Sequence, residues 1–181
     1  MAELVDSGFM EPMAGLEKLN QLPAQEARDT FARCCGSSTW ADRMTQQRPY
    51  QSEKQLQATA SRLWNELKPQ DWLEAFAHHP RIGDTTSLKE KFADTAHWAK
   101  QEQKGIQDAP DDIIQALFSG NQDYEQKFGF IFLVCATGKS AKEMLGLLKA
   151  RMQNDRETEL TIAAGEQEKI TQIRLEKMIH P

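Results

Sequence analysis

Apolar residues recur at helical spacing along most of the chain. The clearest stripe is Leu56, Ala60, Leu63 and Leu67, which predicts a helix over residues 52–67. Similar patterns predict further helices, in chain order, over residues 12–22, 25–35, from 38 to before Arg48, from Pro69 to before Pro80, over 87–104, after Pro110, and over 139–154 and 157–179. No linker, low-complexity tract or long repeat interrupts them. We therefore expect a single compact, multi-helix, all-α domain over residues 1–181, with residues 1–9 as a flexible N-terminal extension.

Two of the expected helix ends depend on particular residues. Gly36 follows an apolar pattern at residues 25–35 and is a natural residue for the left-handed position after a helix. Ser38 can cap the next helix, which carries Trp40 and Met44 inward.

Residues 130–136 are the exception to the helical pattern. This run, Phe-Ile-Phe-Leu-Val-Cys-Ala, is apolar, rich in residues that favour strands, and flanked by Gly129 and Gly138. A lone buried strand would leave its N–H groups without ladder partners. On pattern alone the start of a core helix is favoured, and the alternative is that the amides of this run face another group.

Composition and charge narrow the class of protein. The chain has 181 residues, 39% of them hydrophobic, and a net charge of −5, so nucleic acid is a poor partner. No apolar run approaches the length of a membrane span, and no signal peptide is evident, so we expect a soluble, cytoplasmic protein without a membrane partner. Three cysteines, two of them adjacent, indicate reduced packing thiols.

A group of titratable residues lies at the end of the predicted helix that starts at Pro69. His78 and His79 precede Pro80, and Arg81 and Asp84 follow. Pro80 restricts the backbone of His79 and therefore where its imidazole can point, which suits an acid/base group. The alternative is a solvated helix terminus at which a cationic His interacts with the helix dipole.

Glu102 is a second candidate. Steps of three and four from Leu88 place this carboxylate on the inward face of the 87–104 helix, with Ala99 one turn earlier and the Gln103 amide beside it. A charge on that face needs a partner, unless the last turn frays and Glu102 lies in water.

Arginines on the last two helices are weaker candidates. Arg174 lies at the edge of an apolar stripe with Ile170 and Ile173, and it can present its planar fork to a carboxylate. Arg151 offers the same on the preceding helix, although a surface ion pair is the more frequent outcome for both.

The motifs give little support for a metal site or a nucleotide-binding site. His78, His79 and His97 could combine with Asp84 or Glu102, but no recognised metal-ligand spacing is present. Neither a phosphate-binding glycine loop nor a hydrolase nucleophile elbow occurs.

Taken together, these motifs resemble one known family. The segments that carry the resemblance are Cys35–Trp40 with Met44, Arg48–Tyr50, His79–Gly83, Glu102-Gln103, Asn121 and Tyr124 with Lys127–Phe130, and Ile170 with Arg174-Leu175. In order and spacing they resemble OHCU decarboxylase, where OHCU is 2-oxo-4-hydroxy-4-carboxy-5-ureidoimidazoline. The resemblance covers the chain from about residue 10 to its end.

The resemblance implies an all-α enzyme of urate and purine catabolism that converts OHCU into (S)-allantoin and CO₂. It implies no cofactor and no metal, a small-molecule substrate, and a homodimer. It assigns the acid/base role to His79 and assistance to Glu102. It places substrate binding at Pro80, Ala99, Gln103, Phe132, Leu133, Val134, Cys135, Ala136 and Arg174.

This sequence departs from the family pattern at Ala99, where a Ser is usual, and at Ile131, where a Pro is usual. Two rival functions stay open. One is a non-catalytic helical interaction module with a surface formed by Trp40, Met44 and Trp98. The other is a metal-dependent hydrolase of a ureido compound.

Overall fold

The computed structural model describes residues 15–81, 104–106 and 109–180. Within these ranges the protein contains α-helices, one 3₁₀ turn and no strand, so the all-α prediction is confirmed. The α-helices are α1 (Gly15–Gln21), α2 (Ala24–Cys34), α3 (Ser38–Gln46), α4 (Glu53–Asn65), α5 (Pro69–Ala77), α8 (Asp111–Phe128), α9 (Ala141–Arg151) and α10 (Arg156–Ile179). The predicted extension 1–9 and nearly all of the predicted helix 87–104 lie outside the described residues, and Lys104–Ile106 forms the 3₁₀ turn.

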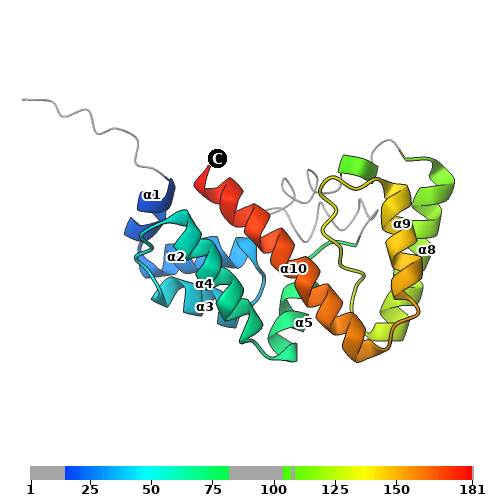
Figure 1. The fold of residues 1–181 in the computed structure, drawn as a ribbon, viewed down its shortest axis with the longest axis horizontal. Helices are drawn as coiled ribbons and strands as arrows, with labels where there is room; N and C mark the ends of the chain where they lie inside the picture. The colour runs from blue at the N-terminus through cyan, green and yellow to red at the C-terminus, as the bar shows by residue number, and fades with distance from the viewer. Residues whose placement is uncertain (1–14, 82–103, 107–108, 181) are drawn as a thin grey trace, which may run out of the picture.

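Helix α10 is the central element of the fold. It packs against α1, α2, α4, α5 and α8, and Figure 1 shows it crossing from the N-terminal helices to the α8–α9 pair. Its length of 24 residues lets one helix contribute side chains to both groups. Residues distant in sequence therefore meet along α10.

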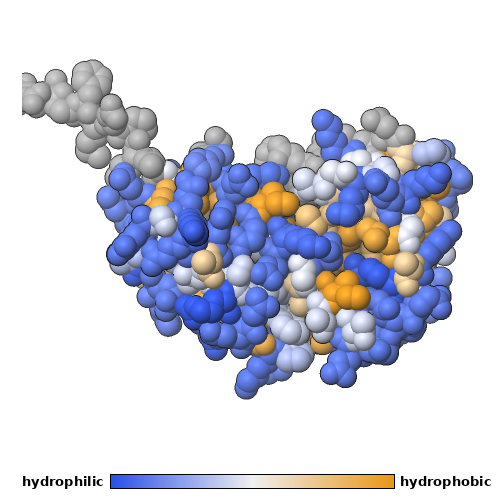
Figure 2. Space-filling view, in the orientation of Figure 1, coloured by the Kyte–Doolittle hydropathy of each residue, from blue (hydrophilic) through white to orange (hydrophobic). Residues whose placement is uncertain are grey.

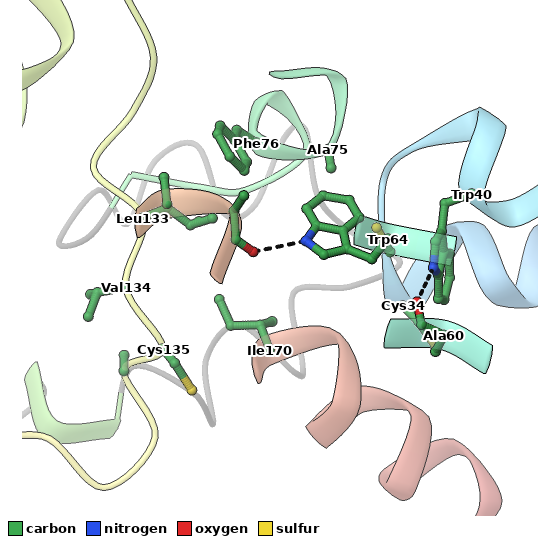
Figure 3. Close-up of a cluster of buried hydrophobic side chains, with 14 of the residues drawn as sticks. Cys34, Trp40, Ala60, Trp64, Ala75, Phe76, Leu133, Val134, Cys135 and Ile170 are labelled. Atoms are coloured by element: carbon green, nitrogen blue, oxygen red, sulfur yellow. Dashed lines mark hydrogen bonds between the residues drawn. The ribbon is translucent and has the colours of Figure 1, made fainter. Parts of the chain in front are cut away.

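The core on the N-terminal side of α10 is built around buried tryptophans. The Trp64 indole N–H donates to the Ala164 carbonyl on α10 at 3.0 Å, and the Trp40 indole donates to the Ala60 carbonyl at 3.1 Å. Figure 3 shows the Trp64 ring between these helices, with Ile170 below it. These bonds satisfy the polar edges of large rings, so their apolar faces can be buried without an unpaired donor.

Two predicted helix ends are wrong: Ser38 is not the N-cap of α3, and Gly36 does not take the left-handed position after α2. Ser37, not Ser38, is the N-cap, and its side chain accepts from the Trp40 amide. Helix α2 ends with Cys35 in extended backbone, and the positive-φ glycines in the described residues are Gly129 and Gly138. Gly36 instead meets a steric need, because a Cβ there would lie 2.5 Å from the His78 Cβ.

Residues 130–136 form neither a helix nor a strand. Gly129 ends α8 in the left-handed conformation at φ 79°, and the chain then runs extended and buried beside α9 and α10 (Figure 1). The favoured prediction of a core helix is therefore wrong. Other groups supply hydrogen bonds to this run: the Cys135 N–H donates to Glu166 at 2.7 Å, and Arg151 donates to the Leu133 carbonyl at 2.7 Å.

The surface shown in Figure 2 is mostly hydrophilic, with apolar areas concentrated over the half that contains α8 and α9. In the part of the chain that the structure describes, the large exposed hydrophobic residues are Phe118, Leu147 and Ile162. None of the described helices has the length and apolar character needed to cross a bilayer.

Candidate active site

His79 lies two residues after the end of α5, just past the His78 C-cap, where the chain continues into residues 79–81. Its amide donates to the Phe76 carbonyl at 3.1 Å, which extends the last turn by one bond. The side chain is 8% exposed, whereas the neighbouring His78 is exposed and its Nδ1 lies 2.9 Å from the Glu74 carbonyl. The structure thus separates the adjacent imidazoles into one buried and one surface group, and it excludes a solvated terminus at His79.

Two polar residues of α10 form a chain of polar contacts that starts at the His79 ring. Nε2 of His79 lies 2.7 Å from Oε1 of Gln167, and Nε2 of Gln167 donates to the Thr171 hydroxyl at 3.1 Å. Gln167 is fully buried and Thr171 is 4% exposed. Buried polar groups of this kind are stable only when their partners are present, so the contacts fix one geometry.

The surroundings of His79 favour its neutral form. Burial first, and then the nearby charges of Arg174 and His78, lower the pKa of the imidazole from 6.5 to about 3, although the Gln167 hydrogen bond acts in the opposite direction. A ring with so low a pKa is a weak proton acceptor at neutral pH, and a nearby carboxylate would have to raise the pKa before the ring could accept and return a proton.

Arg174 lies on the same helix as Gln167 and Thr171, one turn further on. The residue is 4% exposed, and its charge acts on His79, Cys34 and Cys35. The alternative interpretation of Arg174 as a member of a surface ion pair is therefore wrong, because its side chain is buried. A buried guanidinium near the imidazole is suited to hold an anionic substrate group.

A hollow of about 330 Å³ reaches His79 from the outside. Its wall includes Phe76, Pro80, Phe130 and Ile131, and Arg81 and Glu125 lie at its edge. Arg81 donates to Glu125 at 2.8 Å, which ties the segment after His79 to α8. Pro80 lines this hollow together with His79, whereas residues 132–136 are not part of its wall.

A buried ion pair contacts the predicted substrate-binding segment, residues 132–136. Arg151 and Glu159 interact through Nε and Oε1 at 2.5 Å with side-chain exposures of 8% and 0%, and the Tyr124 hydroxyl donates to the same carboxylate. The guanidinium also lies 4.7 Å from the centre of the Phe132 ring. Arg151, a weak candidate from sequence, is thus a buried anchor of the 130–136 segment and not a surface residue.

Part of the predicted site falls within residues 82–103. Ala99, Glu102, Gln103 and also His97 lie outside the described residues. Among the described residues, no group of three or more His, Cys, Asp or Glu side chains could hold a metal ion.

Sequence reasoning missed Gln167 and Thr171. Both lie on the buried face of α10, four residues apart, with Arg174 three residues after Thr171. Polar side chains at positions i, i+4 and i+7 on an otherwise buried face were the available signal.

The fold and the site define a class: an all-helical protein with a buried imidazole and a buried guanidinium beside an extended loop. The family model for OHCU decarboxylase matches residues 20–176. The chain belongs to the OHCU decarboxylase family.

Several known proteins are similar to this chain. The uric acid degradation bifunctional protein TTL of Arabidopsis thaliana is 39% identical over 83% of this chain and 46% of its own length. A decarboxylase of Haloferax volcanii named for the same ureidoimidazoline is 24% identical, over 88% of this chain and 93% of its own. The chain spans less than half the length of the bifunctional relatives it matches from Arabidopsis and Bacillus.

A solved structure supports the same assignment. The crystal structure of OHCU decarboxylase in the presence of (S)-allantoin matches with a TM-score of 0.69 and 38% identity, over 84% of this chain and 99% of that one. An (S)-allantoin synthase crystal structure matches with a TM-score of 0.66 at 19% identity, which shows the common fold.

Proposed function

We propose that this chain decarboxylates OHCU to (S)-allantoin and CO₂ in urate degradation. The observation that carries the proposal is a buried imidazole with a buried arginine nearby, in a chain whose family model matches residues 20–176. Curated relatives of similar length bear the name of the same reaction. The substrate is a small molecule, and the proposal requires neither nucleic acid nor membrane.

The substrate itself supplies the electron sink of the reaction. The bond between the ring carbon and the carboxylate carbon breaks, CO₂ leaves, and the electron pair moves into the adjoining C=N group. The nitrogen that received the electron pair is protonated, the neighbouring hydroxyl gives up its proton and becomes the ring carbonyl, and a proton adds to one face of the ring carbon that carries the ureido group. The reaction needs no metal or organic cofactor for electron withdrawal, so the work of the protein is to bind, orient and move protons.

His79 is assigned the proton transfer, and Glu102 is assigned to assist it. The described surroundings keep the imidazole neutral, with a pKa of about 3 set first by burial, so the ring is a weak proton acceptor until that pKa is raised. A carboxylate brought close by substrate binding or by Glu102 would raise that pKa and allow the same ring to donate.

Substrate recognition is assigned to Arg174 and to the polar backbone near His79. A guanidinium matches a carboxylate by paired hydrogen bonds. Pro80, Ala99, Gln103 and the run Phe132, Leu133, Val134, Cys135 and Ala136 stay as the predicted binding residues. In the structure the Cys135 amide donates to Glu166, so that amide is available to substrate only if Glu166 moves away.

The protein is further proposed to act in the cytoplasm as a homodimer. Cys34, Cys35 and Cys135 are free, buried thiols, which suits a reducing compartment. The dimer is implied by the family resemblance and can be measured by light scattering coupled to size exclusion.

The direct test supplies freshly generated OHCU and follows optical activity at the wavelengths of allantoin. We expect the protein to accelerate the appearance of (S)-allantoin and the release of CO₂, and to retain this activity after exhaustive chelation. Loss of activity with EDTA and recovery with Zn²⁺ would favour the metal-dependent hydrolase. No acceleration by a folded protein would favour a non-catalytic module, but not one with the surface predicted at Trp40 and Met44, because both side chains are fully buried.

A further inference from the structure

Among the described residues, Gln167 is a polar side chain that contacts the imidazole of His79. Its Oε1 atom lies 2.7 Å from Nε2 of His79, across 88 residues of sequence, and its side chain is fully buried. No role in the reaction follows from the family motifs, because Gln167 belongs to none of the segments that carry the resemblance.

The orientation of the Gln167 amide is set by the next residue in the network. The Gln167 Nε2 donates to the Thr171 hydroxyl at 3.1 Å. An amide N–H₂ can only donate, so the Thr171 oxygen is the acceptor in this bond. The amide oxygen is then left to face His79.

An amide oxygen can only accept, so the His79 atom that it faces must donate. We propose that Gln167 is a positioning residue that holds neutral His79 with its proton on Nε2, which makes Nδ1 the nitrogen that exchanges a proton with substrate. A histidine tautomer is commonly set in this way, by the bond that the opposite nitrogen makes. The inference rests on the proposed function for its catalytic consequence, but the tautomer itself can be measured without substrate.

The spectroscopic test uses long-range ¹H–¹⁵N correlations of the imidazoles at neutral pH. The chain has four histidines, and a His79→Asn variant identifies the His79 signals by their loss. We expect the native protein to show a protonated Nε2 and an unprotonated Nδ1 at His79. Gln167→Leu should shift His79 toward a mixture of tautomers. Thr171→Val should do so in part, because without the Thr171 hydroxyl the Gln167 amide can rotate and exchange its oxygen and nitrogen.

The kinetic test separates positioning from binding. Gln167→Leu should lower kcat by about 10-fold to 100-fold and change KM little, because the ring then presents the wrong nitrogen for part of the time. Gln167→Glu keeps an acceptor and should retain the native tautomer and a large part of kcat. The negative charge of this glutamate should raise the pKa of His79, so the acid limb of the pH profile of kcat/KM should move to higher pH. The other charged or titratable neighbours of His79 in the described part are Arg174 and His78.

Gln172→Leu is the matched control. Gln172 is a partly buried glutamine of the same helix that donates to the Gln57 carbonyl and the Ser61 hydroxyl, both on α4. Its loss should alter stability while leaving the His79 tautomer and kcat unchanged. If Gln167→Leu fails to fold, Gln167→Glu and Thr171→Val carry the test.

The possible results distinguish this inference from the proposed function. A native Nδ1-protonated ring, or a folded Gln167→Leu variant with unchanged tautomer and kcat, overturns the role of Gln167. A native protein that shows the Nε2–H tautomer but does not turn over OHCU overturns the proposed function and leaves the tautomer assignment standing.

Discussion

His79 and Gln167 lie 88 residues apart in the sequence, and their side chains are joined by a contact of 2.7 Å between Nε2 and Oε1. One residue follows α5 and the other is in the middle of α10. The contact exists because α10 packs across the end of α5, so the position of the imidazole depends on the packing of these two helices.

Replacing His79 by Asn should remove most of the decarboxylase activity while preserving the helical circular dichroism spectrum. The residue follows α5, so its loss should not break the helix, whereas loss of general acid/base assistance costs on the order of 10²-fold or more. The measurement is kcat/KM on OHCU. His78→Ala should be much milder, because that side chain is exposed, and equal losses in the two variants would contradict the separation of roles.

The same residue should make the fold sensitive to acid. The pKa of His79 falls from 6.5 to about 3 on folding because the ring is buried and Arg174 is near. Between these values the unfolded chain binds a proton that the folded chain does not, so stability falls as pH falls from 6.5 toward 3 and is unaffected above 6.5. His79→Asn should remove a slope of at most about 1.4 kcal/mol per pH unit in the free energy of unfolding, measured by urea denaturation. An unchanged slope would show that the imidazole is not buried in its neutral form.

Glu102→Gln should shift the pH dependence of catalysis if its carboxylate assists His79. Removing the negative charge would let the pKa of the imidazole fall, so the pH profile of kcat/KM should move to lower pH with little change in folding. If Glu102 is solvated, the two curves should superimpose, and His79 would then lack its proposed partner.

Breaking the Arg151–Glu159 pair should destabilise the protein strongly. Both side chains are buried, so Glu159→Gln leaves a guanidinium without its counter-charge, which costs about 3–5 kcal/mol in the free energy of unfolding. We also expect KM for OHCU to rise, because Arg151 holds the Leu133 carbonyl of the predicted binding segment. The control is Asp42→Asn, which breaks the surface pair with Arg28 and should cost roughly 0–1 kcal/mol.

Gly36→Ala should perturb the site through steric contact. The added Cβ would lie 2.5 Å from Cβ and Cγ of His78, so the end of α5 must move and His79 with it. We expect lower stability together with lower kcat. Gly165→Ala is the control, since a Cβ there meets open space within α10 and should stabilise the helix by about 0.5–1 kcal/mol. If Gly36→Ala were as active as Gly165→Ala, the close packing of α5 on Gly36 would not matter for the site.

The sequence by itself determined the all-α class, most helix positions and several helix ends. Apolar periodicity and prolines are local signals, and they located α4 and α5 closely because Ser52 caps the first and Pro69 begins the second. The motif around His79 also identified the imidazole that the structure buries. Local signals sufficed in each case because a helix is formed by hydrogen bonds between neighbours in sequence.

The tertiary structure decided what the polar residues do. Periodicity could not tell a core helix from a buried extended run at residues 130–136, because the bonds that satisfy this run come from Arg151 and Glu166 on other helices. Nor could it show that Gln167 contacts His79 or that the charge of Arg174 acts on it, since both depend on how α10 crosses α5. Burial and electrostatics arise from contacts between distant segments, so the pKa of His79 and the partner of its Nε2 follow from packing and not from spacing along the chain.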